Sequence, residues 1–152
     1  MEKKDLKPAG VFHYFEEICQ VPRPSKKEEK IIAYLKAFGV KHNLETNVDE
    51  AGNVLIKKPA TPGKENLQTV ILQSHIDMVC EKNNDVQHDF LTDPIETEID
   101  GEWLKAKGTT LGADNGIGVA TELAILADDN IEHGPLECLF TVDEETGLTG
   151  AF

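Results

Sequence analysis

Three short segments of this sequence carry the residue types that bind metal ions or transfer protons. The first is Ser74-His75-Ile76-Asp77, which directly follows an apolar run. In extended backbone, residues two apart point to the same side, so Asp77 can accept a hydrogen bond from the imidazole of His75. Such a bond fixes the tautomer of a metal-binding histidine and raises its basicity. A surface histidine with a chance acidic neighbour is the alternative explanation.

The second segment is glycine-rich and runs from Gly108 to Gly118, with Asp114 and Asn115 just before an apolar helical stretch. Glycines let a backbone approach a ligand closely and adopt conformations that other residues avoid. A helix N-cap is an ordinary alternative use of either Asp114 or Asn115. A phosphate-binding loop is disfavoured, because the GxxxxGK[ST] pattern is absent.

The third segment is Asp143-Glu144-Glu145, which follows an apolar run directly. Three consecutive acids repel one another unless a cation or water offsets their charge, although a solvated acidic turn explains many such runs. Taken together, the three segments place a histidine, an aspartate and a glutamate pair at the ends of strands or loops. Ligands of open α/β sheets gather at the carboxyl ends of strands. One imidazole with several carboxylates favours zinc, manganese or cobalt.

The elements that position these segments are predicted from the spacing of apolar residues. Helical spacing predicts a helix over residues 8–20. A capping box of Ser25 and Glu28 predicts the start of a second helix. Its apolar face comprises Ile31, Ile32, Leu35 and Phe38. A third helix over residues 117–127 is apolar nearly all round and is therefore predicted to be buried.

Strands are predicted from β-branched apolar runs and turn residues. Two hairpins are expected, over residues 44–57 and 95–106. The run over residues 69–73 is typical of a strand buried on both faces, and residues 136–142 form a second core strand. The expected fold class is α/β, a mixed sheet flanked by helices within one domain.

Composition restricts the partners of the chain. The formal net charge of −13 over 152 residues disfavours nucleic acid and anionic membrane surfaces. No apolar run approaches the ~18 residues that cross a bilayer, and the segment Met1 to Gly10 lacks the pattern of a signal peptide. The three cysteines are far apart without a CxxC spacing, which is typical of buried thiols in a reducing compartment. These features predict a cytoplasmic protein.

Residues 72–79, 111–118 and 140–147 resemble the aminoacyl-histidine dipeptidases (Xaa-His dipeptidases, also called peptidase D or cytosol nonspecific dipeptidases) of the M20 zinc peptidases. The segment Gly-Ala-Asp-Asn-Gly-Ile-Gly is the most specific of them. The resemblance implies a dipeptidase with two zinc ions, or manganese or cobalt, that cleaves Xaa-His and other dipeptides. In that family pattern His75 binds one metal, Asp114 bridges both and Glu145 binds the other. Glu144 would be the general base, Asp77 would orient His75, and the peptide bond after Asp114 would be cis.

Members of this family extend well beyond the pattern seen in residues 1–152, which would form the N-terminal portion of the catalytic domain without a lid domain. Each metal would then have two protein ligands here, where catalytic zinc usually has three and water. Weak or absent metal binding and little peptidase activity are therefore expected of these residues alone. Exposed strand edges should also favour homo-oligomers. Two alternatives are a broader co-catalytic aminopeptidase and a non-catalytic binding remnant.

Overall fold

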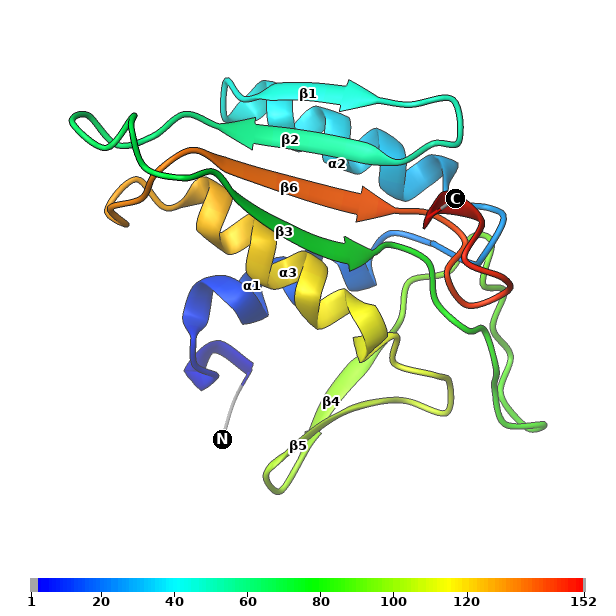
Figure 1. The fold of residues 1–152 in the computed structure, drawn as a ribbon. Coiled ribbons are helices and arrows are strands. Elements are labelled where there is room, and N and C mark those ends of the chain that lie inside the picture. Colours follow the sequence, from blue (N-terminus) through cyan, green and yellow to red (C-terminus); the bar gives the residue numbers. More distant parts are fainter. Residues whose placement is uncertain (1–2, 152) are drawn as a thin grey trace.

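A computed structural model describes residues 3–151 and contains a four-stranded mixed sheet (Figure 1). The strands lie in the order β1-β2-β6-β3, in which β2 is antiparallel to both β1 and β6, and β3 is parallel to β6. Their bounds are Glu45–Val48 (β1), Val54–Lys58 (β2), Val70–His75 (β3) and Leu136–Thr141 (β6). Because β3 and β6 are parallel, their carboxyl ends meet at the same edge of the sheet.

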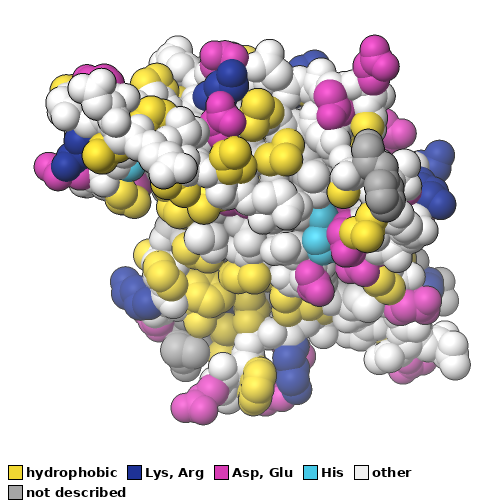
Figure 2. Space-filling view, viewed as in Figure 1, with side chains coloured by type: hydrophobic (Ala, Val, Ile, Leu, Met, Phe, Trp, Pro, Cys, Tyr) yellow, Lys and Arg dark blue, Asp and Glu magenta, His cyan; other side chains and the backbone are white. Residues whose placement is uncertain are grey.

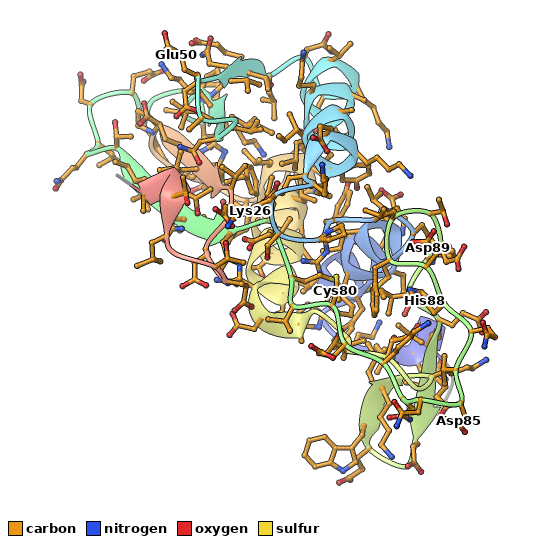
Figure 3. All side chains as sticks on the ribbon, turned by 90° about the vertical axis from the view of Figure 1, so that its right-hand side faces the viewer. Lys26, Glu50, Cys80, Asp85, His88 and Asp89 are labelled. Atoms are coloured by element: carbon orange, nitrogen blue, oxygen red, sulfur yellow. The ribbon has the colours of Figure 1, made fainter. Side chains whose placement is uncertain are left out.

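The α-helices of the described residues cover one face of this sheet, as the two ribbon views together show (Figures 1 and 3). They are α1 (Ala9–Cys19), α2 (Glu29–Lys41) and α3 (Ala113–Ala127), with α2 behind β1 and β2 and α3 behind β3. Short 3-10 turns lie at Lys3–Asp5 and Thr149–Ala151. A separate hairpin, β4 (Thr97–Asp100) and β5 (Trp103–Ala106), lies beside the start of α3. The α/β class predicted from the sequence is confirmed.

The hydrophobic core lies between the sheet and the helices. Val54, Ile56, Cys138 and Phe140 alternate along β2 and β6 on the helical side and are completely buried. From the helices, α1 contributes Ile18, and the other two contribute Ile31, Leu35, Val119 and Leu123. Every second residue of the strands, and helical residues spaced by about 3.6, thus form two apolar surfaces that pack against each other. No helix in residues 3–151 is both long and apolar enough to cross a membrane.

Two expectations about the core elements were wrong. Strand β3 is not buried on both faces, because it is an edge strand next to β6 alone, and Ile71 is 63% exposed. Helix α3 is amphipathic, not buried all round, since Ile117 is 41% exposed and Thr121 also faces solvent. The apolar edge at β3 agrees with the expected exposed strand edge, whereas self-association stays a prediction.

The capping box predicted at Ser25 and Glu28 is also wrong. Helix α2 begins at Glu29 without a side-chain cap. The Ser25 hydroxyl donates instead to Asp77 Oδ2 at 2.7 Å, and Glu28 Oε1 accepts the amides of Lys26 and Asp143. Both side chains therefore make hydrogen bonds elsewhere in the chain and do not cap the helix.

One acidic side chain, Glu122 on α3, lies in the core below the sheet and is 4% exposed. Burial raises the pKa of its carboxyl to about 7, and contacts with Ser74 and Cys138 oppose this only in part. Its Oε2 atom has no hydrogen-bond partner among the described residues. The neutral carboxyl therefore persists in the folded chain up to about pH 7, well above the range of a solvated glutamate.

Glu122→Gln is expected to remove a pH dependence of stability. Between the unfolded pKa near 4.5 and the folded pKa of about 7, the folded chain binds more protons, so its stability falls as pH rises. The loss amounts to on the order of 3 kcal/mol by pH 8 and is absent below pH 4.5. Urea unfolding of both proteins at pH 5 and pH 8 measures it. Equal pH dependences of the unfolding free energy would contradict the expectation.

Candidate metal centre

The candidate centre begins at the last residue of β3. His75 pairs with Thr141 of β6, and its side chain is 7% exposed. The Nδ1 atom of His75 lies 3.2 Å from Asp77 Oδ1, so the two side chains face one site as their spacing predicted. This hydrogen bond directs Nε2 of His75 away from Asp77, toward the glycine-rich segment.

Asp77 is completely buried, and its carboxylate is surrounded by hydrogen-bond donors. Besides His75 and Ser25, it accepts the backbone amides of Glu144 at 3.0 Å and of Glu145 at 3.1 Å. One carboxylate therefore orients the imidazole and also fixes the chain that carries the two glutamates. Several donors on an ionised oxygen pair make this burial tolerable.

Asp114 lies at a kink in the first turn of α3. Its backbone angles are non-helical, and the peptide bond to Asn115 is cis, as the family resemblance implied. The capping interaction is made by Asn115, whose Oδ1 accepts the amide of Gly118 at 3.2 Å. A Cβ atom at Gly118 would lie 2.1 Å from that oxygen. Because Asn115 caps the helix, the Asp114 side chain is free to project toward His75.

The side chains of His75, Asp114 and Glu145 converge, with one ligand atom from each within 4.8 Å of the others. Nε2 of His75 lies 3.1 Å from Asp114 Oδ1. A neutral imidazole that donates through Nδ1 presents a lone pair at Nε2, so a cation can bind between this nitrogen and the Asp114 carboxylate. Two ligand atoms of a tetrahedral zinc lie about 3.3 Å apart, given bonds of ~2.0–2.1 Å. The donor set therefore fits a divalent metal ion.

The negative charges of the site also favour a bound cation. Burial raises the pKa of Glu145, and repulsion from Glu144, Asp114 and Asp77 raises it further, while His75 partly offsets the shift. These surroundings make the negative charge of Glu145 less favourable than that of a solvated carboxylate. A divalent cation would offset this repulsion directly.

Glu144 occupies a different position from Glu145. Its Oε2 lies 3.8 Å from His75 Nε2, and its side chain is 38% exposed. Glu144 lines a cleft of about 610 Å³, together with Gln73, His75, Asp114 and Leu139. This cleft lies on the sheet face opposite the helices, where Figure 2 shows histidine beside acidic side chains. Glu145 does not line it, so the neighbouring glutamates face different surroundings.

A second group of acids, Glu28, Asp77 and Asp143, is buried close to the first. Its oxygens already accept hydrogen bonds from the chain. Asp143 accepts the hydroxyls of Thr146 and Thr149, which lowers its pKa. Because Asp77 and Glu28 likewise bind backbone amides, this group holds the fold together and does not present free ligands.

Sequence reasoning missed Arg23, which links two of the segments. Its guanidinium is buried and donates to the carbonyls of Ile76, Asp77 and Gly112. Gly112 has a φ of +69°, and a Cβ there would lie 2.5 Å from the Arg23 side chain. The absence of a side chain at Gly112 therefore leaves room for Arg23, whereas we expected these glycines to let a ligand approach the backbone. A buried arginine that binds only carbonyls has no sequence pattern by which it could be recognised.

Comparison with known proteins assigns the chain to a family. The model of peptidase family M20/M25/M40 matches residues 71–151, more than half of the chain and all of the candidate centre. The cytosol non-specific dipeptidase of Escherichia coli (strain K12) is 52% identical over 151 residues, which are 99% of this chain. This chain therefore belongs to peptidase family M20/M25/M40.

Solved structures agree with the fold. The aminoacylhistidine dipeptidase of Vibrio alginolyticus matches 100% of the chain with a TM-score of 0.96 and 55% identity. An aminopeptidase of Bacillus cereus matches 93% of the chain and 38% of its own length, with a TM-score of 0.77 and 27% identity. The chain spans 31% of the length of the Escherichia coli and Vibrio alginolyticus proteins.

Proposed function

We propose that the whole protein is a metal-dependent dipeptidase that hydrolyses Xaa-His and other dipeptides, and that this chain supplies part of its metal centre. The observation that carries the proposal is the convergence of His75, Asp114 and Glu145 within 4.8 Å. His75 would hold one ion, Asp114 would be shared by two, and Glu145 would hold the second. Zinc is the favoured ion, with manganese or cobalt as substitutes.

Glu144 acts as the general base in this proposal. Divalent ions held there would supply an acidified water and Lewis-acid polarisation of the scissile carbonyl. Glu144 would take a proton from the attacking water and return it to the leaving amine. Its place in the cleft, beside His75 and Asp114, supports this role. Asp77 holds His75 in the tautomer that leaves Nε2 free.

The substrate class and location rest on the relatives. Two proteins at 52% and 55% identity are named dipeptidases, against 27% for the aminopeptidase, which favours a dipeptidase over the broader aminopeptidase. The word cytosol in the name of the Escherichia coli relative supports a cytoplasmic location. The non-catalytic alternative is disfavoured, because both glutamates keep distinct positions beside His75.

Titration of the chain with Zn²⁺ tests this proposal. We expect measurable but weak binding to the native chain, and a loss of at least ~10-fold in affinity in His75→Ala, because one of three ligands is removed. Isothermal titration calorimetry measures both. Binding should also weaken as pH falls, since protons compete for the imidazole and carboxylates.

His13→Ala is the matched control, because His13 is an exposed histidine on α1 that pairs with Glu17. It should bind Zn²⁺ as the native chain does. Equal affinities in the native chain and His75→Ala, or an equal loss in His13→Ala, would overturn the proposed centre.

A further inference from the structure

The chain that follows β6, residues 142–145, is held by side chains at each of four successive backbone amides. Asn53 Oδ1 accepts the amide of Val142, and Glu28 Oε1 accepts that of Asp143, both at 3.0 Å. The next two amides bind Asp77. Because the accepting residues come from separate parts of the chain, the direction of Glu144 and Glu145 depends on tertiary contacts.

Glu28 makes the contact at the point where the chain turns. Asp143 has a φ of +50°, a left-handed conformation that aspartate adopts at some cost. Lys26, whose amide Glu28 Oε1 also accepts at 2.9 Å, has a φ of +65°. One buried carboxylate oxygen therefore holds two left-handed residues in adjacent turns. Figure 3 shows Lys26 between the strand ends and α2, where these turns meet.

We propose that Glu28 is a positioning residue of the metal centre, which holds Asp143 in its left-handed turn and thereby aims Glu144 and Glu145 at His75. This inference rests on the proposed function. Without the Glu28 acceptor, the amide of Asp143 is buried without a partner. The turn then relaxes toward a right-handed conformation, and the two glutamates that follow it move away from the imidazole.

The first test compares Glu28→Ala with Glu29→Ala. Glu29 is the next residue, exposed in the first turn of α2, so its variant changes the charge equally without touching the turn. We expect Glu28→Ala to weaken Zn²⁺ binding by about 10-fold or more, as loss of a supporting hydrogen bond commonly does. Amide hydrogen exchange at residues 143–145 should quicken by on the order of 10-fold. Glu29→Ala should change neither.

Conservative variants separate positioning from general stability. Glu28→Gln keeps a carbonyl acceptor of the same reach and should bind Zn²⁺ within about twofold of the native chain. Glu28→Asp keeps the charge but is one methylene shorter, so it should also weaken Zn²⁺ binding and quicken exchange at residues 143–145. It provides the test if Glu28→Ala does not fold. In a Glu145→Gln background, Glu28→Ala should lower the affinity by less than about twofold, because both changes act on the same ligand.

Native affinity and native exchange rates at residues 143–145 in both Glu28→Ala and Glu28→Asp would overturn the inference. So would a full, additive loss in the Glu145→Gln background. If the native chain binds no Zn²⁺, the affinities are measured in the whole protein, whose failure to bind Zn²⁺ would refute the proposed function, and the exchange rates at residues 143–145 alone decide whether Glu28 fixes the turn.

Discussion

Asp77→Asn is expected to destabilise the fold by about 3 kcal/mol, the largest effect of a single isosteric change in this chain. Both carboxylate oxygens accept backbone amides, from Glu144 and Glu145, in addition to the His75 ring and the Ser25 hydroxyl. An asparagine offers one acceptor and one donor. In either orientation its NH₂ group therefore faces a backbone N–H, and one buried amide is left without a partner.

The charge lost in Asp77→Asn adds to this cost. The Arg23 guanidinium is buried and donates to the backbone carbonyl of Asp77; burial lowers its pKa, and attraction to the Asp77 carboxylate offsets part of this effect. Zn²⁺ affinity should fall by about 10- to 100-fold, because the orientation of His75 and of Glu145 changes together.

Urea unfolding and Zn²⁺ titration measure the two effects of Asp77→Asn. Asp85→Asn is the matched control, since Asp85 is exposed on an outer loop (Figure 3). Native stability of Asp77→Asn would show that its hydrogen bonds do not hold the site together.

The sequence predicted the elements of the fold well where one physical signal dominates. Helical spacing located α1 and the apolar face of α2, and alternation with turn residues located both hairpins. The α3 prediction began too late, because the kink at Asp114 and Asn115 has no periodic pattern. The error at β3 has a different origin. An apolar β-branched run shows that a strand favours burial, but not whether another strand lies beside it.

Side-chain chemistry at the ends of strands and loops indicates His75, Asp114 and the pair Glu144 and Glu145 as candidates, whereas the choice of Glu145 as the ligand follows from the family resemblance. The structure brings His75, Asp114 and Glu145 together. The roles assigned to them stay proposals. The supporting residues were not predictable: Glu28 was interpreted as a helix cap, and Arg23 was not noticed. Local spacing suggests local partners, whereas these side chains bind backbone groups more than 50 residues away.

Glu144→Gln should abolish most of the hydrolysis while leaving metal binding nearly intact. Glutamine matches glutamate in size but does not take up a proton, so kcat of the whole protein should fall by about 10²- to 10⁴-fold. The Zn²⁺ affinity of the chain should stay within about threefold, because Glu144 lies outside the ligand cluster. Hydrolysis of a dipeptide with a C-terminal histidine, followed with saturating Zn²⁺, gives kcat.

Glu145→Gln is the matched comparison, since it makes the same chemical change one residue away. A neutral amide is a poor zinc ligand, so Zn²⁺ affinity should fall by about 10- to 100-fold, and added metal should restore part of the activity. Metal does not rescue Glu144→Gln, because a missing proton acceptor is not replaced by a cation. The two adjacent glutamates are thus separated by whether zinc restores turnover. The reverse pattern would exchange their roles, and identical patterns would mean that both act only through charge.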